Sequence, residues 1–426
     1  MSQRVIVVHY HELWLKGRNR GFFLNRLLDA IRRTLEGVAV ERIDRPGDRV
    51  LIWFGDGADI DEAIRRLGRV SGIAHLAAAR PVERDMDAIC HAAWQELESL
   101  SFGTFAVRAK RSDKSFPFHS SEIERQVGAH LLERLRAAGR DARVNLNEPE
   151  LTCRIEITPG PALVYARKVP GPGGLPPGTA GKLVCLLSGG FDSAVAAYKM
   201  MKRGGRLIFA HFYGSGARPG ESSVHVAREL VRQLTPYQLT ARLYLVPFEP
   251  IQREIVRFAP EQFRVLLYRR MMLRIGAGIA ARTRALALVT GDSLGQVASQ
   301  TLENMIAVDN AVGQVVFRPL VGDDKQEILA LARRIGTYDI SAEPFHDCCP
   351  VFLPRSPALR ATAAELDGAE AQFDIPALVR RGLETASLER YRLVAGRVML
   401  AHAANLSGAA LPDPTHPREI PAIHQP

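Results

Sequence analysis

The chain has 426 residues, with 56 Lys and Arg against 46 Asp and Glu, so its formal net charge is +10. A charged fraction of 24% and a hydrophobic fraction of 46% exclude wholesale disorder, and the apolar runs are too short to cross a membrane. The length predicts several domains, and the basic balance is typical of proteins that bind nucleic acid or polyphosphate. The first residues lack the basic and apolar regions of a signal peptide, which predicts a cytoplasmic protein.

Residues 1–70 and 71–170 are predicted to form two small α+β units. In the first, the apolar run VIVVHY is typical of a buried strand, and the leucines from Leu24 to Leu35 recur at helical spacing. In the second, residues 105–111 alternate as a half-buried strand. A helix follows whose apolar residues fall on one stripe, namely Ile123, Val127, Leu131 and Leu135.

A Pro/Gly run, GPGGLPPG, falls in residues 171–180 and predicts a linker. Across residues 181–355, short apolar runs alternate with helical patterns, which predicts a doubly wound parallel sheet covered by helices on both faces. Residues 356–426 are expected to contain one or two helices between 378 and 406, followed by a proline-rich, disordered tail. The predicted fold class is therefore a multidomain mixture of α/β and α+β.

Five cysteines, an odd number in a chain expected to be cytoplasmic, argue against a disulfide framework. No Cys-x-x-Cys pair indicates a zinc or thioredoxin-like site. Cys90, Cys153 and Cys185 stand in apolar surroundings and are predicted to be packing residues. Cys348 and Cys349 are different, because they are adjacent in a loop bracketed by prolines, PFHDCCPVFLP.

The strongest local pattern is the hexapeptide SGGFDS, which follows an apolar strand and opens a helix. Its residues are Ser188, Gly189, Gly190, Phe191, Asp192 and Ser193. Glycines let the backbone approach an anion closely, the helix N-terminus presents amide groups, and the serines add hydroxyl donors. The pattern predicts a pyrophosphate cradle that is not a Walker loop, because no Gly-Lys-Ser/Thr closes it. Asp192 is predicted to hold Mg²⁺ or to orient the loop.

The hexapeptide resembles the PP-loop of the ATP pyrophosphatases, which split ATP between the α and β phosphates and adenylate a substrate. Other segments resemble the tRNA 4-thiouridine sulfurtransferase family, also called the ThiI family of thiamine biosynthesis. These segments are HYHELWLKGRNRGFF, FAVRAKRSDKSFPFHSSEIERQVG, KVPGPGGLPPGTAGK, TGDSLGQVASQTLENM, RPLVGDDKQEI, RRIGTYDIS and DCCPVFLP. The resemblance implies a ferredoxin-like N-terminal domain, a THUMP domain that binds tRNA, and a PP-loop catalytic domain. The sequence differs from the members of the family that carry a C-terminal rhodanese domain, because no such domain is expected here. Asp292 stands where this family usually has glutamate.

The resemblance also implies which residues act. ATP, with Mg²⁺, would be held by the hexapeptide together with Leu186, Leu187, His211, Phe212, Arg269, Gly291 and Gln300. Lys325 matches a functional lysine of the family and would neutralise charge that develops on the phosphates. Four basic residues of the THUMP-like stretch would contact tRNA phosphates, namely Arg108, Lys110, Arg111 and Lys114. Without the resemblance, the same stretch is interpreted as a solvated strand face above core phenylalanines.

The predicted function is ATP-dependent transfer of persulfide sulfur to the uridine at position eight of tRNA, which forms 4-thiouridine through an adenylated intermediate. A persulfide on Cys348 would attack C4, and Cys349 is the nearest resolving thiol. Only 71 residues follow Arg355, without a recognisable rhodanese loop, so a cysteine desulfurase or another persulfide donor is expected as a separate partner. The alternatives are sulfur transfer to a thiazole-forming sulfur-carrier protein in thiamine biosynthesis, or a non-catalytic THUMP protein that binds tRNA. A homodimer is a family-level expectation.

Overall fold

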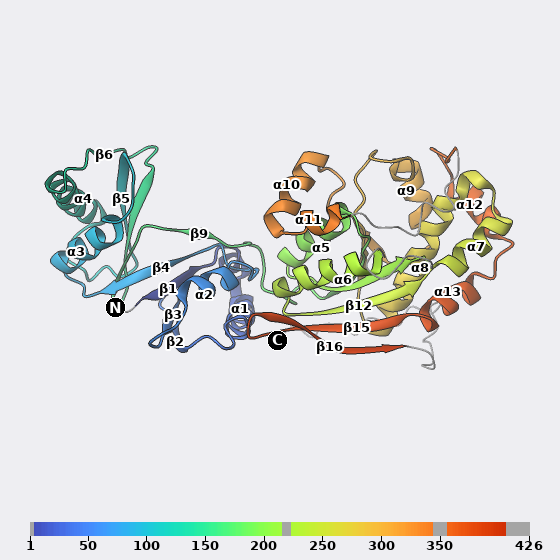
Figure 1. Ribbon diagram of the computed structural model, residues 1–426, viewed down its shortest axis with the longest axis horizontal. Helices are drawn as coiled ribbons and strands as arrows, with labels where there is room; N and C mark the ends of the chain where they lie inside the picture. Colours follow the sequence, from blue (N-terminus) through green and yellow to red (C-terminus); the bar gives the residue numbers. More distant parts are fainter. Residues whose placement is uncertain (1–3, 215–222, 344–355, 406–426) are drawn as a thin grey trace. The chain divides into compact units, whose positions relative to one another are not determined.

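The computed structural model describes residues 4–214, 223–343 and 356–405, and the chain divides into two compact units (Figure 1). Unit 1 is Met1–Pro176 and unit 2 is Pro177–Pro426. In the described ranges, no helix combines the length and the apolar character needed to cross a membrane.

Unit 1 is built on one sheet whose strands follow the order β2-β3-β1-β4-β8-β7-β5-β6, with β9 beside β4. The strands are β1 (Val5–His9), β2 (Val40–Asp44), β3 (Arg49–Phe54), β4 (His75–Val82), β5 (Thr104–Arg111), β6 (Arg143–Val144), β7 (Leu151–Ile157), β8 (Ala162–Tyr165) and β9 (Val169–Pro170). The helices are η1 (Glu12–Asn19), α1 (Arg20–Thr34), α2 (Ile60–Leu67), α3 (Met86–Leu97) and α4 (Ser120–Ala137).

Strand β4 joins the two halves of unit 1. Residues 75–79 pair with β1, whereas residues 80–82 pair with β8. The predicted boundary at residue 70 therefore does not separate two sheets, because one continuous strand serves both halves.

The apolar residues predicted for the second half of unit 1 form its core. All four residues of the α4 stripe are fully buried, which confirms the predicted helix. They pack with α3 and with the inward face of β5, where Phe105 is fully buried. Phe116 is also in this core, at 3% exposure, so these two rings pack inside the protein.

A group of buried charges connects the two halves of unit 1. Glu156 of β7 forms an ion pair with Arg49 of β3 at 2.5 Å and a hydrogen bond with Nε2 of His9 of β1 at 2.8 Å. Tyr165 of β8 donates to the same carboxylate at 2.6 Å. Arg49 is fully buried, so the carboxylate compensates a charge that water cannot reach.

Glu156→Gln is expected to lower the free energy of unfolding of unit 1 by about 1–3 kcal/mol, because it removes the buried one of the two carboxylates that pair with Arg49 and leaves only Asp48, at 2.7 Å. The exposed Glu98→Gln, as a matched control, should change it by less than about 0.5 kcal/mol. All three tryptophans lie in unit 1, at positions 14, 53 and 94, so fluorescence in a urea titration of the full chain reports on this unit. Equal effects of the two substitutions would contradict this prediction.

The same carboxylate gives unit 1 a dependence on pH. Burial alone would raise the pKa of Glu156, but His9 and Arg49 outweigh burial and lower the pKa to about 2. The contribution of Glu156 is therefore fully present above its ordinary pKa of 4.5 and is lost as the pH falls toward 2. In Glu156→Gln, the stability of unit 1 should depend less on pH over this window.

Unit 2 is built on a second sheet, with the order β14-β13-β10-β11-β12-β15-β16. Its strands are β10 (Lys182–Leu186), β11 (Arg206–Tyr213), β12 (Thr240–Pro247), β13 (Ala287–Val289), β14 (Val315–Phe317), β15 (Ser387–Val394) and β16 (Arg397–Asn405). The first five strands in the sheet order are parallel, as the alternating pattern predicts.

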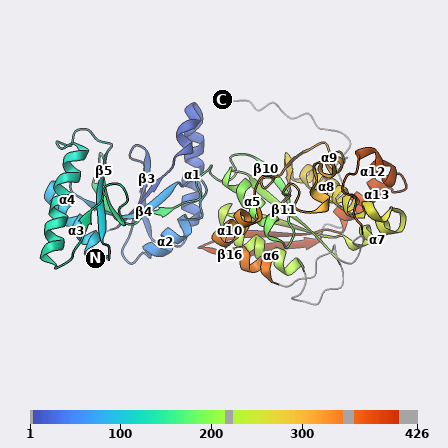
Figure 2. The ribbon, with the colours of Figure 1, turned by 90° about the horizontal axis from the view of Figure 1, so that it is seen from above.

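Helices cover both faces of this sheet and can be followed in Figure 2. One face packs against α5 (Phe191–Lys202), α6 (Ser223–Leu234) and α10 (Lys325–Ile335). The other face packs against α7 (Glu249–Phe258), α8 (Arg264–Thr283) and α13 (Ile375–Glu384). The remaining helices are η2 (Thr235–Tyr237), η3 (Glu261–Phe263), η4 (Ala298–Gln300), α9 (Leu302–Asp309), α11 (Tyr338–Ala342) and α12 (Ala363–Glu370).

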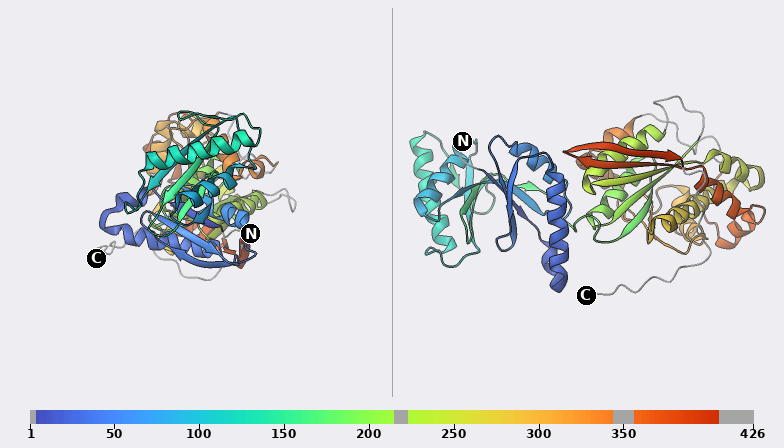
Figure 3. Two further views of the ribbon diagram at one scale, coloured as in Figure 1. Left: turned by 90° about the vertical axis from the view of Figure 1, so that its left-hand side faces the viewer. Right: turned by 90° about the horizontal axis from the view of Figure 1, so that it is seen from below.

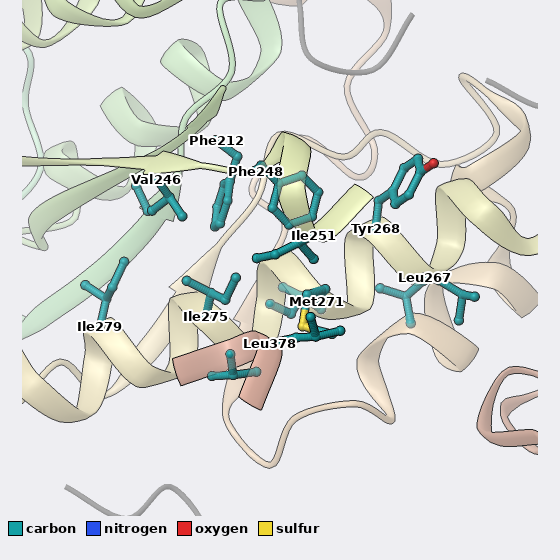
Figure 4. Packing of buried hydrophobic residues seen from close by; sticks show 14 of the residues in the cluster. Phe212, Val246, Phe248, Ile251, Leu267, Tyr268, Met271, Ile275, Ile279 and Leu378 are labelled. Carbon is teal, nitrogen blue, oxygen red and sulfur yellow. The ribbon is translucent and has the colours of Figure 1, made fainter. Parts of the chain in front are cut away.

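The long helix α8 is fixed against the sheet by a buried apolar cluster (Figure 4). Its Tyr268, Met271 and Ile275 lie in one core with Phe212 of β11 and Phe248, which directly follows β12. Each of these side chains is at most 6% exposed. This packing makes α8 a rigid support for the polar side chains on its remaining surface.

The C-terminal stretch corrects one prediction. Residues 378–406 were expected to form helices, but α13 ends at Glu384 and the hairpin of β15 and β16 follows it (Figure 3). Strand β15 pairs antiparallel with β12 and extends the parallel sheet. Within β15, buried Tyr391 and Leu393 alternate with exposed arginines, which is a period of two rather than 3.6. The predicted disordered tail, residues 406–426, lies outside the described residues.

The predicted linker is partly packed. The division between the units falls after Pro176, inside the Pro/Gly run. Before it, Gly171 N–H donates to the carbonyl of Ala74 at 3.0 Å, and Gly173 N–H donates to that of Ile73 at 2.7 Å. A Cβ atom on Gly171 would lie 2.3 Å from the Ile73 carbonyl oxygen, so glycine is required here by close backbone packing.

Candidate active site

The SGGFDS loop, residues 188–193, lies where the strand order of the second sheet reverses. It follows β10, which has β11 on one side and β13 on the other. In open α/β sheets, ligands bind at the carboxyl ends of the strands at such a switch point. Helix α5 begins at Phe191, so its first backbone N–H groups have no partner within the helix and can bind an anion.

The two serines of the loop have different surroundings. Ser193 is 4% exposed, and its Oγ lies 3.1 Å from Ser188 N, 3.0 Å from Ser188 Oγ and 3.3 Å from the Gly190 carbonyl. These contacts use the Ser193 hydroxyl to hold the shape of the loop, whereas Ser188 is exposed. That both serines offer donors to a phosphate stays a prediction.

Asp192 and Lys325, which are 133 positions apart in the sequence, are brought together at the loop. Lys325 Nζ donates to Asp192 Oδ1 at 2.8 Å, and Gln296 Nε2 donates to Oδ2 at 3.0 Å. Lys325 is the first residue of α10, which starts with a capping box between Asp324 and Glu327. Gln296 belongs to the GDSLGQ segment but was not among the predicted site residues, because nothing in its local pattern indicates a contact with a distant loop.

Gly291 lies against the start of α5. A Cβ atom there would lie 2.6 Å from Ser193 N and 2.7 Å from the carbonyl carbon of Asp192. The absence of a side chain therefore lets the segment after β13 approach the backbone of the SGGFDS loop. This contact accounts for the glycine by protein packing, whereas the sequence suggested close approach to a nucleotide.

Several predicted nucleotide-binding positions have side chains that point into the core. His211 is 1% exposed, with Nδ1 at 2.8 Å from the Leu187 carbonyl and Nε2 at 3.0 Å from Ser223 Oγ. Leu187 and Phe212 are also buried, and Leu186 packs against the α8 cluster. Any contact of Leu187, His211 or Phe212 with a ligand would therefore involve the backbone, whereas Leu186 is only partly buried.

A buried carboxylate organises the polar groups on the other side of Gly291. Asp292, at 4% exposure, accepts from Arg269 Nη2 at 2.6 Å, Thr290 Oγ1 at 2.8 Å, Arg318 Nε at 3.0 Å and Gln300 Nε2 at 3.3 Å. Burial alone would raise the pKa of Asp292, but Arg269 and Arg318 outweigh burial and lower it. Asp292 is therefore ionised at neutral pH and holds Arg269 and Gln300, two predicted site residues.

Arg270, the residue after Arg269, makes different contacts. Arg270 turns to α12, where it contacts Asp367 at 2.5 Å and Glu370 at 3.4 Å. Consecutive residues on a helix face about 100° apart, so only Arg269 points toward the segment of Asp292.

The predicted tRNA-contacting residues of unit 1 fall into two groups. Arg108 and Lys110 are exposed on the face of β5 opposite Val107, and Lys114 is exposed after the strand. Lys110 Nζ forms an ion pair with Asp48 at 2.6 Å. Arg111 is half-buried and donates to the Phe116 carbonyl at 3.2 Å, so it holds the following loop.

The cysteines also fall into two groups, those packed in the protein and the adjacent pair. Cys153 and Cys185 are fully buried, which confirms the prediction that they are packing residues, and burial raises the pKa of each thiol to about 12. Burial also raises the pKa of half-buried Cys90. None of these three is activated as a thiolate nucleophile. Cys348 and Cys349 lie outside the described residues.

Comparisons with known proteins agree along the length of the chain. Family models match residues 5–77 (ThiI ferredoxin-like domain), 83–167 (THUMP domain) and 178–375 (Thiamine biosynthesis protein, ThiI). A probable tRNA sulfurtransferase of Thermus thermophilus is 43% identical over 92% of this chain and 95% of its own length. The chain belongs to the ThiI family of tRNA sulfurtransferases.

Other ThiI relatives and solved structures support the same fold. A probable tRNA sulfurtransferase of Moorella thermoacetica is 40% identical over 90% of this chain and 96% of its own length. A crystal structure of a 4-thiouridine synthetase–RNA complex with bound ATP has a TM-score of 0.79 and 33% identity, over 91% of this chain and all of that one. A structure from Pyrococcus horikoshii, 24% identical with a TM-score of 0.59, shares the fold over 78% of this chain. The predicted ferredoxin-like, THUMP and PP-loop architecture is confirmed.

Proposed function

We propose that this chain uses ATP to transfer sulfur to a uridine of tRNA and so forms 4-thiouridine. The observation that carries the proposal is the convergence of Asp192, Lys325 and the N-terminus of α5 at the switch point of the second sheet. An anion-binding loop beside the ion pair of Asp192 and Lys325 suits an enzyme that acts on a nucleotide phosphate. The family of the chain supports tRNA as the acceptor.

Different groups of the site would bind different parts of ATP. The backbone amides of the SGGFDS loop would hold the pyrophosphate part, and Lys325 would neutralise the charge that develops as pyrophosphate leaves. Arg269 and Gln300 would contact the rest of the nucleotide. The described residues contain no cluster of three His, Cys, Asp or Glu side chains fit for a metal, so Mg²⁺ at Asp192 would be completed by phosphate and water oxygens. Bound there, Mg²⁺ would supply further neutralisation of phosphate charge.

The first chemical step would convert the uridine oxygen into a leaving group. O4 of the uridine attacks the α-phosphorus of ATP, the bond between the α-phosphorus and the bridging oxygen breaks, and pyrophosphate leaves. C4 then carries AMP through the former O4. Lys325, held by Asp192 at 2.8 Å, lies beside the loop where the departing negative charge would collect.

The sulfur step is assigned to the vicinal cysteines. The outer sulfur of a persulfide on Cys348 attacks C4, forms the C–S bond and expels AMP together with the former O4. The Cys349 thiolate then attacks Cys348 Sγ, which breaks the S–S bond, leaves the sulfur on the uridine and forms a disulfide between the cysteines. Two equivalents of an external thiol reduce this disulfide and are themselves oxidised to a disulfide. A separate persulfide donor, such as a cysteine desulfurase, reloads Cys348.

The proposal is tested by nucleoside mass spectrometry of an unmodified tRNA transcript incubated with the full chain, ATP, Mg²⁺ and a persulfide donor. We expect 4-thiouridine in the complete mixture, none without ATP, and none in a transcript with cytidine at position eight. Absence of 4-thiouridine from the complete mixture would contradict the function. Thiolation without ATP would contradict the activation step. Replacing tRNA by a sulfur-carrier protein tests the alternative acceptor in the same assay.

A further inference from the structure

The four groups that donate to Asp292 come from separate parts of unit 2. Arg269 lies on α8, Gln300 on η4 and Arg318 directly after β14, while Thr290 is two positions before Asp292 in the chain. Gly291, which precedes Asp292, is packed against the SGGFDS loop. The position of the carboxylate is therefore fixed by the same backbone that supports the proposed phosphate site.

This carboxylate determines how the Gln300 amide is turned. An ionised carboxylate only accepts hydrogen bonds, so Gln300 must present its NH₂ group to Asp292 and keep Oε1 on the other side. Gln300 is 9% exposed, and its Oε1 is buried without a hydrogen-bond partner among the described residues. A buried amide oxygen in this state is suited to accept a hydrogen bond from a ligand.

The two purines differ at the position that such an acceptor would test. Adenine carries the N6 amino group, which donates, whereas guanine carries O6, which accepts. An amide oxygen fixed toward the base would bind the donor of adenine and repel the oxygen of guanine. A freely turning amide would show no such preference, because its NH₂ group could replace the oxygen.

We infer that Asp292 is a positioning residue, which fixes the Gln300 amide and the Arg269 guanidinium so that the nucleotide site selects adenine over guanine. This inference rests on the proposed function, since it concerns the same ATP site. Asp292 acts through Gln300 and Arg269 and needs no contact with the nucleotide. Arg269 is held at 2.6 Å by Asp292 and at 3.4 Å by Ser299 Oγ, so the carboxylate is its stronger contact.

The test compares the dissociation constants of non-hydrolysable α,β-methylene ATP and α,β-methylene GTP for the full chain by isothermal titration calorimetry. The wild type should prefer the ATP analogue by at least about 100-fold. Asp292→Asn should reduce this preference to less than about 10-fold, mainly by weakening the ATP analogue, because the new amide no longer dictates the orientation of Gln300. Gln300→Leu, which removes the acceptor, should reduce the preference in the same way.

Asp309→Asn is the matched control. Asp309 binds the same Arg318 at 2.6 and 2.7 Å and has no contact with Arg269 or Gln300 in the described part of the chain. The substitution removes a carboxylate that binds Arg318, as Asp292 does. It should leave the preference for the ATP analogue within about 3-fold of the wild type. Asp292→Glu keeps a group that only accepts, and it should preserve most of the preference.

Four outcomes would overturn the inference. They are a wild type without preference, a folded Asp292→Asn that keeps the wild-type preference, a Gln300→Leu that keeps it, and an equal loss in Asp292→Glu and Asp292→Asn, which would assign the effect to packing. Thermal melting shows whether each variant folds. If Asp292→Asn does not fold, the result for Gln300→Leu decides the question. The binding assay contains no tRNA or sulfur donor. A failure of this inference therefore appears in the binding assay. A failure of the proposed function would appear as a wild type that binds ATP but forms no 4-thiouridine.

Discussion

Asp192→Asn is expected to reduce the rate of 4-thiouridine formation by at least about 100-fold while the second unit stays folded. The substitution keeps the size of the side chain but removes the charge that holds Lys325 Nζ at 2.8 Å. It would also remove the carboxylate that we propose holds Mg²⁺. Because Lys325 and Asp192 act as one unit, the double variant with Lys325→Ala should be little worse than either single variant. Single-turnover thiolation of a tRNA transcript measures this rate.

Asp323→Asn is the control for the loss of an ion pair between the same two elements. Asp323 precedes α10 and pairs with Lys199 of α5, so it links these helices as the Asp192–Lys325 pair does. Partly exposed pairs of this kind contribute at most about 1 kcal/mol to stability, so both variants should unfold at similar temperatures. A thiolation rate in Asp192→Asn that equals the rate in Asp323→Asn would contradict the catalytic role of Asp192.

Cys348→Ser is expected to abolish thiolation completely while ATP still binds. A serine cannot carry the persulfide sulfur, so the reaction should stop after activation of the uridine. Release of pyrophosphate should then not exceed one equivalent per tRNA. Mass spectrometry of the nucleosides and a pyrophosphate assay on the same samples measure both quantities, with a cysteine desulfurase as the sole sulfur source.

Two other cysteines provide controls for this prediction. Cys90→Ser should keep the wild-type rate, because burial raises the pKa of that thiol and no step uses it. Cys349→Ser should permit the attack on C4 but leave the tRNA joined to Cys348 through the S–S bond until an external thiol cleaves it, because the proposed resolving thiol is lost. Full thiolation by Cys348→Ser would show that another group carries the sulfur.

The sequence predicts the parts of the fold that depend on local periodicity. The α4 stripe and the alternation of strand and helix in unit 2 are such patterns, because each residue's burial follows from its spacing. The SGGFDS loop is equally local, since the strand, the glycines and the helix start are adjacent. The hairpin of β15 and β16 was missed, although alternation in β15 and the glycine at position 396 were available as signals.

The rest of the site depends on contacts between distant segments. Gln296 is 104 positions from Asp192, and Arg318 is 26 positions from Asp292, yet both pairs form hydrogen bonds. No local pattern distinguishes these side chains from ordinary surface residues. His211 shows the reverse case, since a predicted site residue is buried by its bonds to Leu187 and Ser223. Only the folded chain reveals which side chains reach the site.

An isotope label shows whether ATP activates the uridine oxygen. A tRNA transcript is prepared with ¹⁸O at O4 of the uridine at position eight and is incubated with the full chain, ATP, Mg²⁺ and a persulfide donor. We expect one ¹⁸O atom in each AMP released per 4-thiouridine formed, because O4 leaves on the α-phosphorus. Mass spectrometry of AMP and pyrophosphate measures the label. Unlabelled AMP, or ¹⁸O found in pyrophosphate or water, would show that ATP does not activate O4.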